Sequence, residues 1–289
     1  MRKFFFCLFL ITALFSCGRH DIFRNDEARI AVALQEALFL GSQTAAIKLG
    51  DSSCEINVAN KEGCVTGYLG NKLVEILLPD TVERVLTSIS KITVALKPYT
   101  SYLPTLPDLS HYGDSIKVAL NRGAEQAAPA SIGVFKEAIF GLSFSDAKGI
   151  LLGSSNEATS YLHTTTYSGL QSAFAPIIRE PLELLKPDKY WGFIASGYNA
   201  LAAAHLQVSS IGFSLEPLPY DHLPTNISEY LSNYATEWAL DGLFKMVGQQ
   251  EEKLREDPLK AVREAGSLIT DDVGDLLNDV FGKAKHGLY

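Results

Sequence analysis

The chain has 289 residues, of which 47% are hydrophobic and 20% are charged, and its formal net charge is −8 at pH 7. This composition is typical of a folded protein with a large core and excludes an intrinsically disordered chain. The acidic balance also argues against nucleic acid or an anionic lipid surface as the partner, because both attract basic patches.

The N-terminus has the pattern of an export signal. Arg2 and Lys3 precede an apolar core at residues 4–15, which is too short to span a bilayer stably and is typical of a secretory signal. The sequence LFSC that ends at Cys17 resembles a lipobox, the site at which bacterial lipoproteins are cleaved and acylated on the new N-terminal cysteine. We therefore predict a signal peptide at residues 1–16, with ordinary secretion and a retained anchor as alternatives.

Lipidation of Cys17 would leave residues 17–25 as a lipidated tether between the membrane and the helical domain. Several acyl chains on one residue would anchor the protein far better than a single chain. Gly18 stands in place of the aspartate that is associated with inner-membrane retention in enteric bacteria. We therefore expect a periplasmic protein at the outer membrane rather than the inner membrane. Loss of residues 1–16 removes Arg2 and Lys3 and lowers the side-chain charge from −8 to −10.

A helix is predicted to begin at Asp26 and to weaken at Gly41 and Gly50. Its apolar residues recur on one side, at Ile30, Ala33, Leu34, Ala37 and Leu38. Residues 69–78 are apolar and also look helical. Pro79 and Asp80 then open a helix, and the proline-rich residues 98–107 form a connector.

Two of the four cysteines, Cys54 and Cys64, remain once the leader and the lipidation site are set aside. In an oxidising periplasm a disulfide is the simplest interpretation of this pair. Closing so short a loop would contribute about 2–3 kcal/mol by reducing the entropy of the unfolded chain. A metal site is not favoured, because two ligands at this spacing lack a CxxC core or nearby histidines.

The helix predicted over residues 114–128 has two different faces. Its apolar face carries Ile116, Ala119, Leu120, Gly123 and Ala127. Asn121, Arg122 and Glu125 lie together on the opposite face, and the last two can pair across one turn. Two interpretations stay open: an exposed ion pair worth roughly a few tenths of a kcal/mol, or a polar network that faces other helices or a ligand.

Pro129 ends that helix, and shorter helices follow. The next has an apolar stripe of Ile132, Phe135, Ala138 and Ile139. Ser143 or Ser145 can cap another helix, which Gly153 ends.

A longer helix is predicted from Glu157. It should bury Leu162, Thr166, Leu170, Ala173, Phe174 and Ile177. His163 is expected on the same face, where a hydrogen-bonded core histidine is a commoner finding than a ligand. Pro176 and Pro181 should kink or end this helix.

Helices are also predicted near the C-terminus. Residues 186–188 restart a helix, and residues 226–229 (NISE) fit a capping box for one that runs to about residue 256. The inward side chains of this last helix should include Ile227, Tyr230, Leu231, Tyr234 and Trp238. Aromatic residues are frequent here, and they indicate either core packing or a groove for an apolar or peptide ligand.

Several of these segments resemble the bacterial domain of unknown function 4197 family. They are residues 33–38 (ALQEAL), 40–43 (LGSQ), 120–126 (LNRGAEQ), 144–151 (FSDAKGIL), 158–161 (ATSY), 174–177 (FAPI) and 234–244 (YATEWALDGLF). The resemblance covers most of the chain after residue 28. It implies a helical, exported bacterial protein, often a lipoprotein, and carries no activity with it. The family tends to be basic after the ATSY element, whereas this chain reads LHTTT.

Patterns for chemistry are weak. The chain contains no GxSxG elbow and no HExxH motif, and its six histidines lack helical ligand spacing. We therefore predict no catalytic residue, no metal ligand and no cofactor.

The sequence thus predicts an all-α, single-domain, antiparallel helical bundle over residues 26–289. We expect an envelope lipoprotein, held at the membrane by its N-terminal lipid, that binds or scaffolds an envelope protein or an apolar ligand without catalysis. The first alternative is a hydrolase-type enzyme whose polar site combines Asn121, Arg122, Glu125, Tyr161 and His163. The second is a purely structural role.

Overall fold

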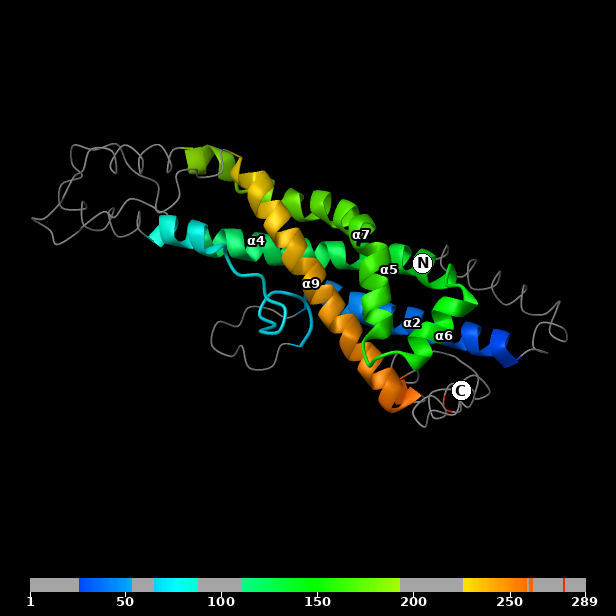
Figure 1. Cartoon of the computed structure of the whole chain (residues 1–289). Helices are drawn as coiled ribbons and strands as arrows, with labels where there is room; N and C mark the ends of the chain where they lie inside the picture. Colours follow the sequence, from blue (N-terminus) through cyan, green and yellow to red (C-terminus); the bar gives the residue numbers. More distant parts are fainter. Residues whose placement is uncertain are drawn as a thin grey trace, which may run out of the picture. The chain divides into compact units, whose positions relative to one another are not determined.

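The computed structural model describes residues 26–53, 65–87, 111–192, 226–258, 260–261 and 278. The predicted signal peptide, the lipidation site Cys17, the tether and the predicted Cys54–Cys64 disulfide lie outside the described residues. Within these residues the secondary structure is helical and contains no strand, which confirms the all-α prediction (Figure 1). None of the described helices is both long and apolar enough to cross a membrane.

Several helical elements follow one another in the described part of the chain. They are α2 (Asp26–Gly50), α4 (Tyr112–Ala127), η3 (Ala128–Ala130), α5 (Ser131–Phe140), α6 (Phe144–Leu152), α7 (Glu157–Glu183) and α9 (Ile227–Glu256). Residues 80–87 and 187–192 are also helical, as the sequence predicts at Asp80 and at residues 186–188.

The chain divides into two compact units. Unit 1 consists of Met1–Ala45, Gly133–Thr166 and Met246–Tyr289, and unit 2 consists of Ala46–Ile132 and Tyr167–Lys245. Helices α2, α5, α7 and α9 each contribute residues to both units. The arrangement of residues 26–289 as one antiparallel bundle in a single domain stays a prediction.

Capping residues set the starts of two helices where the sequence predicts them. The Ser143 hydroxyl accepts a hydrogen bond from the Asp146 amide at 3.1 Å, and the Asp146 carboxylate accepts one from the Ser143 amide at 3.1 Å. Ser143, and not Ser145, is therefore the cap of α6. At α9, the Asn226 side chain accepts a hydrogen bond from the Glu229 amide at 3.0 Å.

The core of unit 1 forms where the apolar stripes of its helices meet. Its buried side chains include Ala33, Leu34, Leu38, Phe135, Ile139, Ile150, Ala158, Leu162, Val247 and Leu254. The rings of Phe39 and Phe140 pack beside this core with their centroids 5.6 Å apart. The Phe135 and Ile139 positions confirm the stripe predicted for α5.

In unit 2, α4 packs tightly against α7. A Cβ atom on Gly123 would lie 2.9 Å from the Cα atom of Ile178, so only glycine permits this approach of the two backbones. Ile116, Leu120 and Ile178 are fully buried around this contact. The predicted apolar face of α4 is therefore confirmed. Gly123 is needed on this face because the backbones of α4 and α7 approach each other there.

The prediction of a helical segment at residues 69–78 is wrong. These residues form turns and irregular backbone, with Gly70 at a φ of 81°. Side chains from α4 bind the backbone amides of Leu69 and Ile76. Those amides are therefore bonded to side chains and not to carbonyls one helical turn earlier.

His163 and Trp238 are exposed, although the sequence places both on buried faces. The buried residues of α7 recur every four positions, so their stripe winds around the helix. At Leu162 this stripe points roughly 100° away from His163. Trp238 lies at the edge of the buried stripe of α9 and is 50% exposed.

The two prolines of α7 differ in their effect on the helix. Pro176 lies inside α7 without ending it, and the helix ends two residues after Pro181.

Candidate functional site

Asn121 binds the backbone N–H and the backbone C=O of one residue, Ile76, in unit 2. Its side-chain oxygen accepts a hydrogen bond from the Ile76 amide at 2.9 Å, and its side-chain nitrogen donates one to the Ile76 carbonyl at 2.8 Å. The same nitrogen donates to the Lys117 carbonyl at 2.8 Å. Asn121 is fully buried, so these bonds replace the hydration that its amide loses.

Glu125, one turn further along α4, binds two successive backbone amides. Its Oε1 atom accepts hydrogen bonds from the amides of Tyr68 and Leu69, both at 3.0 Å. Its Oε2 atom accepts one from Nη1 of Arg122 at 2.6 Å. Glu125 is 2% exposed, so its negative charge is balanced by one guanidinium and two peptide dipoles.

Gly67 makes room for this carboxylate. Its φ of 69° is one that side-chain-bearing residues rarely adopt, and a Cβ atom there would lie 2.6 Å from Oε1 of Glu125. The following residue, Tyr68, is fully buried and donates its hydroxyl to the Ala239 carbonyl at 2.7 Å. Burial, and then the charge of Glu125, raise the pKa of Tyr68 well above its usual value.

Two basic residues of α4, Arg122 and Lys117, also bind residues that precede α4 in the sequence. Arg122 donates to the Ser52 carbonyl at 3.0 Å as well as to Glu125. Lys117 forms an ion pair with Glu75 at 2.7 Å. Asn121 and Glu125 are buried, so the polar face of α4 is more than an exposed ion pair. Its distant partners are backbone groups of residues 52, 68, 69 and 76, which belong neither to another helix nor to a ligand. We call Asn121, Arg122 and Glu125 together the α4 clamp.

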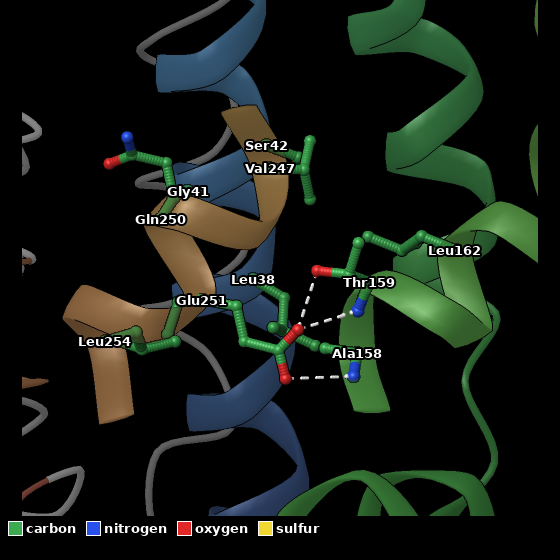
Figure 2. Close-up of a pocket in the computed structure, with 11 residues that line it drawn as sticks. Leu38, Gly41, Ser42, Ala158, Thr159, Leu162, Val247, Gln250, Glu251 and Leu254 are labelled. Atoms are coloured by element: carbon green, nitrogen blue, oxygen red, sulfur yellow. Dashed lines mark hydrogen bonds between the residues drawn. The ribbon is translucent and has the colours of Figure 1, made fainter. Parts of the chain in front are cut away.

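A second buried glutamate, in unit 1, binds the first turn of α7. Oε1 of Glu251 accepts a hydrogen bond from the Ala158 amide at 3.0 Å, and Oε2 accepts one from the Thr159 amide at 2.8 Å (Figure 2). The Thr159 hydroxyl donates to Oε2 at 2.7 Å. Arg255 pairs with Oε1 at 2.8 Å and also donates to the Ile150 carbonyl at 2.9 Å. A carboxylate is favourable here because the N-terminus of a helix is positive.

A small hollow lies beside Glu251, and Figure 2 shows the side chains around it. Its empty volume is about 250 Å³, which includes space open to solvent. The lining residues are Ala37, Leu38, Gly41, Ser42, Ala158, Thr159, Leu162, Val247, Gln250, Glu251 and Leu254. Pockets for drug-sized ligands are usually larger, at roughly 300–1,000 Å³. Since Glu251 is already bound by the chain itself, this hollow does not make a persuasive ligand site.

The remaining two candidate residues, Tyr161 and His163, belong to unit 1, whereas the α4 clamp belongs to unit 2. Tyr161 is half-buried and His163 is exposed. Burial, and then the charge of Asp146, raise the pKa of the Tyr161 hydroxyl. In the part of the chain that the structure describes, no group of three or more histidine, cysteine, aspartate or glutamate side chains could hold a metal ion.

A family model described as a protein of unknown function (DUF4197) matches residues 24–282. The chain belongs to this family. No curated protein and no solved structure matches the chain. The expected family resemblance is thus confirmed.

The geometry explains two of the segments that carry the family resemblance. In residues 120–126, Asn121, Arg122 and Glu125 bind the chain's own backbone, and Gly123 permits close packing against α7. In residues 158–161, the amides of Ala158 and Thr159 bind Glu251. In both segments the polar groups of the chain serve to hold its fold.

Sequence reasoning missed Glu251 and Asp188 as functional parts of the fold. The Asp188 carboxylate accepts hydrogen bonds from the amide and hydroxyl of Ser228, in the first turn of α9. Glu251 stands next to the exposed Glu252, in a charged stretch with no distinguishing pattern. Only its register on the buried stripe of Val247 and Leu254 could have indicated that it points inward.

Proposed function

We propose that the protein is a lipid-anchored envelope protein that acts by binding another protein and not by catalysing a reaction. The observation that carries the proposal is how the buried polar side chains are used. Asn121, Glu125 and Glu251 each bind backbone amides of the same chain. Side chains held in this way position secondary structure and leave little capacity for a substrate.

The predicted export signal and lipobox indicate that this binding would occur in the cell envelope. Acylation of Cys17 would hold the helical domain at the periplasmic face of a membrane, preferably the outer membrane, with residues 17–25 as the tether. A protein held there meets other envelope proteins in two dimensions, which raises their effective concentration. An apolar ligand is the alternative binding partner, because aromatic side chains can also line a groove for such a ligand.

The enzyme alternative has lost its main support. A hydrolase site built on the α4 clamp needs a carboxylate or amide that can reach a substrate. Both oxygens of Glu125 and both polar atoms of Asn121 are engaged, and both residues are buried. A substrate would have to displace the backbone of Tyr68 or Ile76 before it could reach them.

The proposal is tested in intact cells with a photo-crosslinking amino acid placed singly at exposed positions of several helices, such as Lys136, Glu180, Glu237 and Lys253. We expect at least one position to give a protein adduct of a single mass. We also expect Cys17→Ser to move the protein from the membrane to the soluble fraction and to reduce that adduct. Absence of protein adducts at every position would overturn the binding role, and membrane retention of Cys17→Ser would overturn the lipid anchor.

A further inference from the structure

One face of α9 in unit 2 combines aromatic rings with carboxylates. At about 100° per residue, Tyr230, Tyr234, Glu237, Trp238 and Asp241 fall within roughly 100° of the helix circumference. Glu237, Trp238 and Asp241 are exposed, and the two tyrosines are half-buried. The opposite face of the same turns is buried and carries Leu231, Ala235, Ala239 and Leu243. The aromatic face is therefore the outward side of the helix and not part of the core.

Trp238 is unusual because half of this large side chain is in contact with solvent. Its exposed fraction is 50%, whereas the other tryptophan, Trp191, is 3% exposed. The rings of Tyr234 and Trp238 lie one turn apart, with centroids separated by 5.9 Å and planes inclined at 49°. Tryptophan and tyrosine dominate the energetics of protein interfaces, since each buries a large area with few rotatable bonds.

Carboxylates border the two rings. Glu237 and Asp241 lie on the same face of α9, and their charges, after burial, raise the pKa of Tyr167 on α7. Burial, Tyr230 and then Asp80 raise the pKa of Tyr234. Asp241 and Glu237 therefore lie close to the Tyr167 hydroxyl, and Asp80 lies close to the Tyr234 hydroxyl.

One basic residue also lies on this face of α9. Lys245 lies one turn beyond Asp241, and its ammonium donates to the Leu73 carbonyl at 3.3 Å. Glu237 and Asp241 therefore outnumber the single cation among the described residues of this face. Asp80 adds a further carboxylate near Tyr234, where it contributes to the raised pKa of that tyrosine.

We propose that Tyr234, Glu237, Trp238 and Asp241 form a docking surface for an arginine- or lysine-bearing segment of a partner protein. This inference rests on the proposed binding function and names its surface and the chemistry of its partner. A cation placed over the Trp238 ring is attracted by the electron-rich face, and a guanidinium at its edge can reach a carboxylate of Glu237 or Asp241. The chain's net charge of −8 adds attraction for a basic partner over longer distances.

The first test uses the full lipidated chain in detergent and fluorescein-labelled peptides of six arginines or six glutamates, with binding followed by fluorescence anisotropy at low salt. We expect the arginine peptide to bind and Trp238→Ala to weaken it about fivefold to tenfold. Glu237→Gln combined with Asp241→Asn should weaken it similarly and reduce its dependence on salt. The matched controls, Phe144→Ala at another exposed ring and Glu252→Gln at another exposed carboxylate, should leave binding unchanged.

If the wild-type protein and Trp238→Ala bind the arginine peptide with equal affinity, the inference is overturned. So does Trp238-dependent binding to vesicles of phosphatidylcholine without binding of the peptide, because the surface would then recognise a lipid headgroup. Because Trp238 is exposed, the variant should fold, and an unchanged circular dichroism spectrum checks this.

The second test separates this inference from the proposed function. A photo-crosslinker is placed at Lys245, one turn beyond Asp241 on the same face, and, for comparison, at Lys136, Glu180 and Lys253 in intact cells. An adduct at Lys245 that is lost in Trp238→Ala supports the docking surface. Adducts at other positions that do not change in Trp238→Ala overturn the docking surface and leave the binding role standing. Absence of adducts at all positions overturns both.

Discussion

The carboxylate of Glu125 accepts a hydrogen bond from the backbone amide of Tyr68 at 3.0 Å, although 57 residues separate the two in the sequence. A buried carboxylate is costly unless charges and donors compensate it, and here Arg122 and the amides of Tyr68 and Leu69 do so. Glu125, a candidate for catalysis in the sequence, therefore fixes the turn that contains Tyr68 and Leu69. Its removal should lower the stability of the protein.

Glu125→Ala should lower the free energy of unfolding by about 3 kcal/mol or more, because it leaves two buried amides without their acceptor and Arg122 without its carboxylate partner. Glu125→Gln keeps one acceptor oxygen and should have a smaller effect. Urea unfolding followed by circular dichroism measures both variants. Glu83→Ala, at an exposed glutamate of the same unit, is the control and should change stability by less than about 0.5 kcal/mol. An equal effect of Glu125→Ala and Glu83→Ala would refute the clamp.

Replacement of glycine by alanine should have opposite effects at two helical positions. Gly123→Ala places a methyl group 2.9 Å from the backbone of Ile178 and should destabilise the protein by about 1–3 kcal/mol. A Cβ atom on Gly149 in α6 meets no atom within 4 Å, so Gly149→Ala should stabilise it by about 0.5–1 kcal/mol. Thermal unfolding of the two variants checks the signs. A stabilising Gly123→Ala would contradict the close packing of α4 on α7.

Glu251→Ala should loosen the first turn of α7. It removes the acceptor of the Ala158 and Thr159 amides and leaves Arg255 without its carboxylate, so a loss of about 3 kcal/mol is expected. Hydrogen exchange of the two amides should become faster than in the wild-type protein. Glu252→Ala changes the exposed neighbour on the same helix and should leave both amides protected. Unchanged protection in Glu251→Ala would contradict this role.

The stability of the protein should fall at high pH partly through Tyr112. Its ring packs edge-on against Tyr190 with centroids 5.4 Å apart, and burial, then Tyr190 and Asp188, raise its pKa from 10.0 to about 12. The unfolded chain therefore releases this proton first, and the contribution is lost as the pH rises from 10 towards 12. The difference in unfolding free energy between wild type and Tyr112→Phe should be constant below pH 10 and shrink above it. A difference that does not change with pH would contradict the raised pKa.

The helices could be predicted from the sequence because their signals are local. Asn226 caps α9, the helix ends at Glu256 as expected, and Ser143 caps α6. Each of these features depends on residues within one or two turns, so spacing and capping chemistry are sufficient to find it.

The content of the candidate site could be predicted only in part. The grouping of Asn121, Arg122 and Glu125 on one face was visible, but their partners at Ile76, Ser52 and Tyr68 are 45, 70 and 57 residues away. No local pattern specifies such contacts between a side chain and a distant backbone. The error at residues 69–78 has the same origin, since apolar content alone does not show that α4 binds those amides.

Hydrogen exchange of the backbone amides of Tyr68, Leu69 and Ile76 tests most directly that the polar residues of α4 hold the chain's own backbone. In the wild-type protein all three amides should be protected almost to the level set by global unfolding, although they lie outside any helix. Glu125→Ala should remove protection at Tyr68 and Leu69, and Asn121→Ala should remove it at Ile76. Exchange of these amides in the wild-type protein at the rate of an unstructured peptide would contradict the account.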